Sequence, residues 1–149
     1  MKKLFSLISL FLLCLCGMAA EDVTTMAEMY HIYPYAEAPG QTGSSSEILL
    51  IMKNRTAIAT WSCTLELPEG VTFSSVSADI EDGRYPEGYN AEITHTQNEA
   101  GNVVTLTCHG TEGVSLTGTD GAVAVVTVDV AKSVTPGDYE VVVSNILLE

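Results

Sequence analysis

Residues 48–68, ILLIMKNRTAIATWSCTLELP, combine two strand patterns separated by a short polar break. The first run is almost wholly apolar, which is typical of a strand that is covered on both faces. In the second run Trp61, Cys63 and Leu65 alternate with polar residues, so they fall on one face of a half-buried strand. We expect this pair of strands to form the spine of a β-sandwich, with Trp61 in its core.

Further strand patterns follow on either side of this stretch, each bounded by glycine, proline, serine or asparagine. This succession, without a helix longer than a turn, predicts an all-β protein: an immunoglobulin-like or jelly-roll β-sandwich of about eight or nine strands. In the late strand we expect Ala124, Val126, Val128 and Val130 to be buried. The predicted strands are 29–33, 47–53, 57–67, 71–76, 92–97, 102–109, 122–130 and 139–148.

The first twenty residues have the three parts of a secretory signal peptide: Lys2 and Lys3, an apolar run, and the small-residue end at Ala19 and Ala20. Processing as a lipoprotein at Cys14 or Cys16 is the less favoured alternative, because leucine precedes each of these cysteines. We expect a signal peptide at 1–20, a disordered lead-in at 21–28 and a single domain at 29–149. The protein would then be exported to the periplasm, the cell surface or the medium.

The chain is strongly acidic, with 19 acidic and six basic residues and a net charge of −13. Loss of Lys2 and Lys3 with the signal peptide would bring the net charge to −15. Such a surface repels phosphate backbones, so we expect no nucleic-acid partner. Beyond the predicted signal peptide no apolar run is long enough to span a bilayer.

Two cysteines, Cys63 and Cys108, remain after signal-peptide removal, and each shares a strand face with apolar residues. Export permits a disulfide, and two inward cysteines on facing sheets could form a bridge across the core. Alternatively, both are buried thiols that pack as small hydrophobic side chains. The sequence leaves both alternatives open.

The order of motifs resembles that of bacterial cohesin-like modules, which are grouped with carbohydrate-binding sandwich folds. The resemblance is carried by ILLIMKN and AIATWSCTLELPEGV early in the chain, and by DGAVAVVTVDV and PGDYEVVVSNILL near its end. It implies a jelly-roll-like sandwich whose flat face or loops hold another protein or a glycan. It also implies that the two late motifs are neighbouring core strands.

Catalytic and metal-binding patterns are missing from the sequence. His31, His95 and His109 fall on three separate predicted strands, and Cys108 and His109 point to opposite faces of one strand, which excludes a Cys–His dyad. Zinc would need three or four clustered ligands. Acidic residues at 79–87 lack the spacing of a calcium loop, so a solvated loop is the better interpretation. We therefore expect no enzyme activity, no metal and no cofactor.

The region most similar to a ligand site is the segment GRYPEGYN, in which Arg84, Tyr85, Glu87, Tyr89 and Asn90 lie close together in sequence. Tyrosine and arginine are enriched where proteins bind partners, and aromatic rings can also stack on sugar rings. In the alternative interpretation, the two tyrosines fold back and cap the edge of the sandwich.

These observations predict an exported, non-catalytic binding module of the protein-binding, cohesin-like type. Its partner would be another exported protein or a polysaccharide. One alternative is a carbohydrate-binding module, which requires exposed aromatic residues; Tyr85 and Tyr89, or Tyr30, Tyr33 and Tyr35 near the first strand, could supply them. A second alternative is a structural spacer that leaves no large apolar patch exposed.

Overall fold

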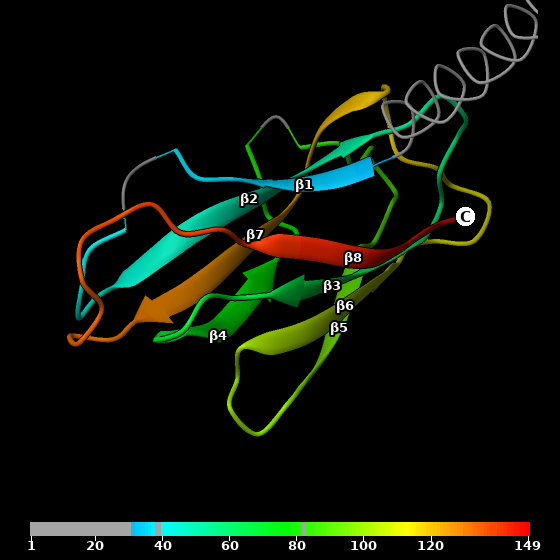
Figure 1. The fold of residues 1–149 in the computed structure, drawn as a ribbon. Helices are drawn as coiled ribbons and strands as arrows, with labels where there is room; N and C mark the ends of the chain where they lie inside the picture. Colours follow the sequence, from blue (N-terminus) through cyan, green and yellow to red (C-terminus); the bar gives the residue numbers. More distant parts are fainter. Residues whose placement is uncertain (1–30, 38–39, 82) are drawn as a thin grey trace, which may run out of the picture.

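A computed structural model of the chain describes residues 31–37, 40–81 and 83–149. These residues form an all-β sandwich of two four-stranded antiparallel sheets, as predicted, with no helix in the described part (Figure 1). The predicted signal peptide and lead-in lie outside the described residues. The strands are β1 (His31–Tyr35), β2 (Ser45–Lys53), β3 (Trp61–Glu66), β4 (Val71–Ser77), β5 (Glu92–Gln97), β6 (Val103–His109), β7 (Asp120–Val130) and β8 (Val142–Leu148).

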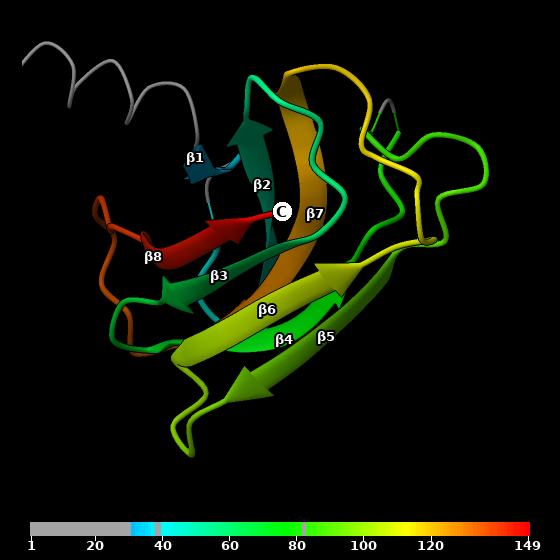
Figure 2. The same cartoon turned by 90° about the vertical axis from the view of Figure 1, so that its right-hand side faces the viewer.

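The first sheet has the strand order β1-β2-β7-β4 and the second sheet has the order β5-β6-β3-β8 (Figure 2). The two strands of the opening motif therefore lie in different sheets, where β2 and β3 are both inner strands. The two late strands are also separated, because β7 is an inner strand of the first sheet and β8 is an edge strand of the second. The expectation that they are neighbours was wrong.

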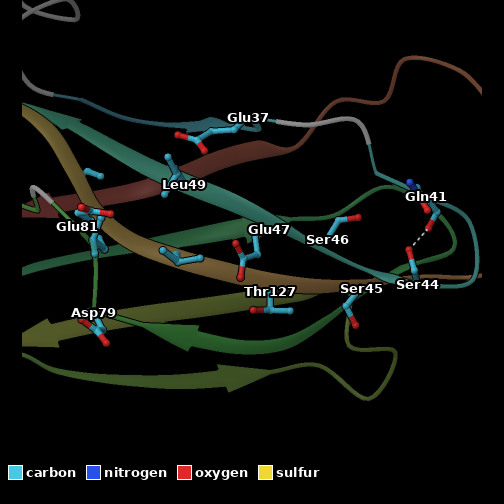
Figure 3. A pocket seen from close by; sticks show the side chains of 13 residues that line it. Glu37, Gln41, Ser44, Ser45, Ser46, Glu47, Leu49, Asp79, Glu81 and Thr127 are labelled. Atoms are coloured by element: carbon cyan, nitrogen blue, oxygen red, sulfur yellow. Dashed lines mark hydrogen bonds between the residues drawn. The ribbon is translucent and has the colours of Figure 1, made fainter.

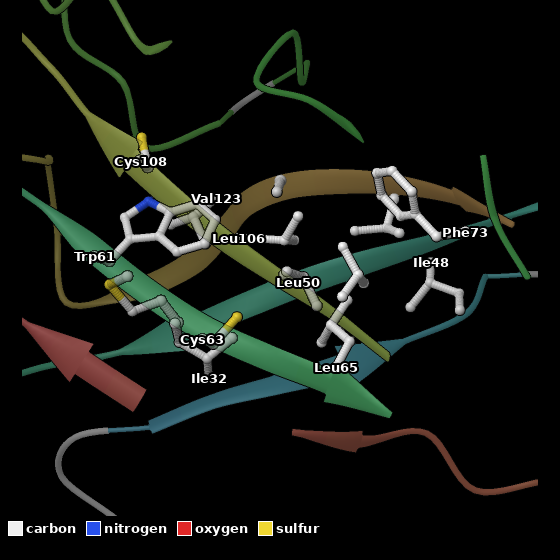
Figure 4. Packing of buried hydrophobic residues seen from close by; sticks show 14 of the residues in the cluster. Ile32, Ile48, Leu50, Trp61, Cys63, Leu65, Phe73, Leu106, Cys108 and Val123 are labelled. Carbon is white, nitrogen blue, oxygen red and sulfur yellow. The ribbon is translucent and has the colours of Figure 1, made fainter. Parts of the chain in front are cut away.

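The core fills the space between the sheets with the inward residues of every inner strand (Figure 4). Trp61 is 1% exposed, which confirms its predicted place in the core. Leu50 and Met52 from the first sheet and Leu65 and Leu106 from the second are fully buried beside it. Burial of such large apolar side chains is the main favourable term for this fold.

The apolar run of β2 is not covered on both faces, contrary to the prediction. Leu50 and Met52 are buried, whereas Leu49 and Ile51 are only half-buried on the outer face of the first sheet. Their outward position makes this face partly apolar. Two predicted starts were wrong, because residues 57–60 form a loop before β3 and residues 139–141 precede β8. β1 extends to Tyr35, two residues beyond its predicted end, and the predicted residues 29–30 lie outside the described residues.

A bulge in β7 changes which of its residues face the core. Leu50 pairs with Ala124 but Ile51 pairs with Ala122, which leaves Val123 without a partner on β2. As a result Val123 and Ala124 are both fully buried. Strict alternation predicted the burial of Ala124, Val126 and Val128 correctly, missed Val123, and overestimated the burial of Val130, which is half-buried.

Cys63 and Cys108 are both buried and free, as in the alternative of two buried thiols, and no bridge joins them across the core. They lie on neighbouring strands of one sheet, not on facing sheets, because Cys63 pairs with Leu106 and Cys108 pairs with Trp61. Such diagonal neighbours are about 7–8 Å apart, whereas a disulfide needs Cα atoms within about 4.4–6.8 Å. Burial raises the pKa of Cys63 to about 12, so this thiol stays protonated at neutral pH.

Candidate functional site

The segment 83–90 is built into the sandwich rather than standing away from it. Arg84 is 3% exposed, and its guanidinium donates hydrogen bonds to the carbonyl oxygens of Thr117 (2.7 Å), Met52 (3.2 Å) and Gly118 (2.7 Å). Its side chain thereby ties the end of β2 to the loop before β7. Desolvation lowers the pKa of Arg84 from its ordinary value, and the nearby Asp120 carboxylate opposes this shift.

The two tyrosines of this segment point inward as well. The Tyr85 hydroxyl donates to the carbonyl oxygen of Val123, at the bulge in β7, and accepts a hydrogen bond from the Trp61 indole. The Tyr89 hydroxyl donates to the carbonyl oxygen of Ala59, and this side chain is 5% exposed. Burial is the main cause of the raised pKa of both phenols.

Of the five residues predicted to bind a ligand, only Glu87 and Asn90 are exposed. Arg84 and Tyr89 are buried and Tyr85 is half-buried, as in the alternative interpretation in which the tyrosines cap the sandwich edge. Arg84 and Tyr89 could not contact a partner without leaving their places in the fold. A binding role for the exposed part of this loop stays a prediction.

A different surface, the outer face of the second sheet, carries ordered rows of hydroxyl side chains. In the first row Thr96, Thr105, Thr64 and Ser144 are cross-strand neighbours from β5 to β8. The second row runs in the same way through Thr94, Thr107 and Ser62, and it ends on β8 at the apolar Leu147. The residues that alternate with these on β3 and β6 point into the core, so the rows lie on the outer side of the sheet, although Thr64 itself is buried, with 8% exposed.

This hydroxyl face, as we call the outer surface formed by these two rows, carries little charge. Its carboxylates on the strands are Glu66, the last residue of β3, and Glu92, the first of β5. Along β8 it borders exposed apolar side chains, with Val142 and Leu147 exposed by 41% and 53%. On a chain with 19 acidic residues, this face combines few carboxylates with an apolar border.

Local hydrogen bonds hold the side chains of the hydroxyl face in place. Thr64 and Thr105 share a hydrogen bond of 3.1 Å between their hydroxyl oxygens, and the Asn145 amide donates to Thr64. Asn145 lies at an irregularity in β8 and has a φ of 50°, a left-handed conformation that asparagine tolerates better than most residues. A partner would therefore meet a surface that is already ordered.

Sequence reasoning missed the hydroxyl face, although part of its signal was visible. Two threonines stand two positions apart in 92–97 and again in 103–109, which places hydroxyl side chains on one face of each strand. The sequence does not reveal that β3 and β8 lie beside β6 and continue the same rows, because strand order is set by contacts between residues that are distant in sequence.

Within the described ranges no group of three or more His, Cys, Asp or Glu is placed to hold a metal ion. The same residues contain no helix that could cross a membrane.

Comparison with solved structures gives consistent matches to one kind of protein. The sixth cohesin of scaffoldin B from Acetivibrio cellulolyticus, solved in complex with a Cel5 dockerin, is 19% identical with a TM-score of 0.61, over 78% of this chain and 82% of the cohesin. The chain has a cohesin-like fold. A non-cellulosomal cohesin from the archaeon Archaeoglobus fulgidus is 16% identical with a TM-score of 0.59, over 80% of this chain and 77% of that one.

The cohesin CaCohA2 from Clostridium acetobutylicum matches at 12% identity with a TM-score of 0.58, over 80% of this chain and 78% of that chain. Neither a protein-family model nor a curated protein matches the sequence. The likeness is therefore one of fold: the cohesin-like sandwich extends over most of the chain, while these three sequences are only 12–19% identical to it.

Proposed function

We propose that this chain is an exported, non-catalytic protein-binding module that docks its partner on the hydroxyl face. The observation that carries the proposal is the pair of ordered hydroxyl rows beside the apolar border on β8. The fold adds support, because the solved structures with this fold include cohesins in complex with dockerins. The partner would be a protein that is exported in the same way.

The physical basis of this proposal is the low cost of desolvating the hydroxyl face. Threonine and serine hydroxyls can donate and accept hydrogen bonds, and their burial avoids the large penalty of burying carboxylates. Apolar side chains on β8 add hydrophobic area beside them. The outer face of the first sheet offers a less favourable surface, because its carboxylates Glu47 and Asp129 lie within their strands, whereas those of the hydroxyl face are the terminal residues of theirs.

A capture experiment with a matched pair of variants tests the proposal. The tagged chain, expressed without residues 1–20, is used to capture proteins from the envelope and culture fluid of the source organism. Thr105→Arg places a large charge in the centre of the hydroxyl face, whereas Ser75→Arg places the same charge on the exposed outer side of β4 in the other sheet. We expect one protein that is captured by the parent and by Ser75→Arg but not by Thr105→Arg.

Capture that is equally strong with Thr105→Arg, in a variant with unchanged strand content by circular dichroism, would contradict the proposed surface. Absence of any captured protein would contradict the protein-binding function itself. Export is tested separately by sequencing the N-terminus of the protein recovered from the culture fluid or periplasm, where we expect Ala20 or Glu21 as the first residue.

A further inference from the structure

The outer face of the first sheet is hollowed into a broad, open groove on the side of the sandwich opposite to the hydroxyl face. Its volume is about 1030 Å³. Leu49 of β2, which is paired with Val125 of β7, lies on its floor. Glu37 and Gln41 line one side of the groove, and Asp79 and Glu81 line the other (Figure 3). The groove does not include the buried tyrosines of the segment 83–90.

Hydrogen-bond acceptors dominate the lining of the groove. Glu37, Glu47, Asp79 and Glu81 bring carboxylates, which only accept hydrogen bonds when ionised. Ser44, Ser45, Ser46 and Gln41 lie together at the end of the groove away from Glu81 and Asp79 (Figure 3), and none of the 13 lining residues is basic. A ligand that fits this lining supplies many hydrogen-bond donors and carries no negative charge.

Two tyrosines of β1 lie beside the groove, on the same outer face of the sheet. Tyr35 of β1 is paired with Leu49, which is on the groove floor, and Tyr35 is 53% exposed. Tyr33 is two residues away on the same strand, so it lies on the same outer face. An exposed aromatic ring beside polar side chains can pack on the apolar side of a sugar ring while its neighbours bind the hydroxyls.

We propose that this groove binds a neutral polysaccharide, with Tyr35 as a stacking residue and Glu47 as a hydrogen-bond acceptor for sugar hydroxyls. The proposal rests on the groove, its apolar floor and the exposed tyrosine taken together, not on the acidic residues alone. A sugar chain matches this surface better than a basic peptide does, because the apolar floor and the exposed Tyr35 ring offer packing area for a sugar ring beside the carboxylate acceptors. The site is independent of the hydroxyl face.

Gel electrophoresis through soluble polysaccharide tests this proposal. The probes are a β-glucan, a galactomannan and an arabinoxylan, all neutral, and the protein is the chain purified from a bacterial host that expresses the whole sequence. We expect at least one probe to retard the parent protein. Tyr35→Ala should weaken this binding by about tenfold, because stacking on one aromatic ring contributes roughly that factor to the affinity. Glu47→Gln, which keeps the shape of the side chain, should also weaken it.

Tyr139→Ala is the matched control, because Tyr139 is the other strongly exposed tyrosine among the described residues, lies between β7 and β8, and does not line the groove. It should leave retardation unchanged within about twofold.

Retardation by none of the three polysaccharides would overturn the proposal. Retardation of Tyr35→Ala that is as strong as that of the parent would also overturn it. Binding of a lysine-rich peptide in place of all three probes would also overturn it, in favour of a cationic partner. Loss of capture in Thr105→Arg tests the other face and has no bearing on these outcomes.

Discussion

Arg84 shows how a residue that suggests a ligand site can be part of the structural framework. Its three guanidinium hydrogen bonds satisfy the carbonyl oxygens of Met52, Thr117 and Gly118, and its backbone carbonyl accepts hydrogen bonds from Thr117 in return. Its aliphatic stem packs over Gly121, where an added Cβ would lie 3.2 Å from the stem and where φ is 145°. The segment 83–90 is thereby fixed to both β2 and the start of β7.

Replacing Arg84 by methionine should destabilise the fold strongly. Arg84→Met keeps most of the stem but leaves three carbonyl oxygens without donors, which should lower the free energy of unfolding by about 3 kcal/mol. Urea denaturation followed by tryptophan fluorescence measures this loss. Arg55→Met is the control, because Arg55 is exposed and its replacement should change the free energy by less than about 0.5 kcal/mol. Equal stability of the two variants would show that Arg84 is not an anchor.

The buried thiol of Cys63 predicts a particular dependence of stability on pH. Its pKa is raised from 9.0 to about 12 in the folded chain because burial disfavours the thiolate. Between these two values the unfolded chain loses the proton while the folded chain keeps it, so stability is complete below pH 9 and falls as pH rises towards 12. We expect the melting temperature of the parent to decrease between pH 8 and pH 11, by calorimetry.

Cys63→Ala removes this titration, so its melting temperature should decrease less over the same pH range, whatever its starting value. Tyr85, Tyr89 and Cys108 also have raised pKa values and will leave a residual decrease. Ser62→Ala, beside Cys63 but with no titrating group, should follow the parent. A pH dependence of Cys63→Ala that is as steep as that of the parent would contradict the assignment.

The contact between the 83–90 segment and the strand β6 is set by a glycine. A Cβ added to Gly110, just after β6, would lie 2.1 Å from the Tyr89 ring, which shows how directly this ring packs on the backbone. Gly110→Ala must therefore displace Tyr89 and its hydrogen bond to Ala59, and we expect a loss of about 1–3 kcal/mol in urea denaturation. Gly137→Ala, where the added Cβ meets only an ordinary contact at 3.8 Å, should be nearly neutral. Full stability of Gly110→Ala would refute this packing.

Strand identity could be predicted for most elements because period-2 patterns are local. β5 matches its predicted range, and β4 and β6 differ from theirs by one residue at one end. Strand pairing could not be predicted, since the separation of β2 from β3 into different sheets depends on contacts far apart in sequence. For the same reason Arg84 and Tyr89 were placed on a surface loop: nothing in GRYPEGYN reveals that β2, β7 and the loop before β7 surround it.

The whole molecule is a sandwich with two chemically different outer faces. The first sheet carries a groove lined with acceptors, and the second carries the hydroxyl rows and the apolar border on β8. Because the two faces lie on opposite sides of one core, a protein and a polysaccharide could be held at the same time without competing. Such a module would connect its protein partner to a glycan through a chain with a cohesin-like fold.

The measurement that tests the central claim most directly is the affinity of the captured protein for two variants of the chain, by titration calorimetry. If the partner docks on the hydroxyl face, Thr105→Arg should bind at least about tenfold more weakly than the parent, and Ser75→Arg should bind with unchanged affinity. Unchanged affinity of Thr105→Arg, or an equal loss in both variants, would contradict the claim that the hydroxyl face is the binding surface.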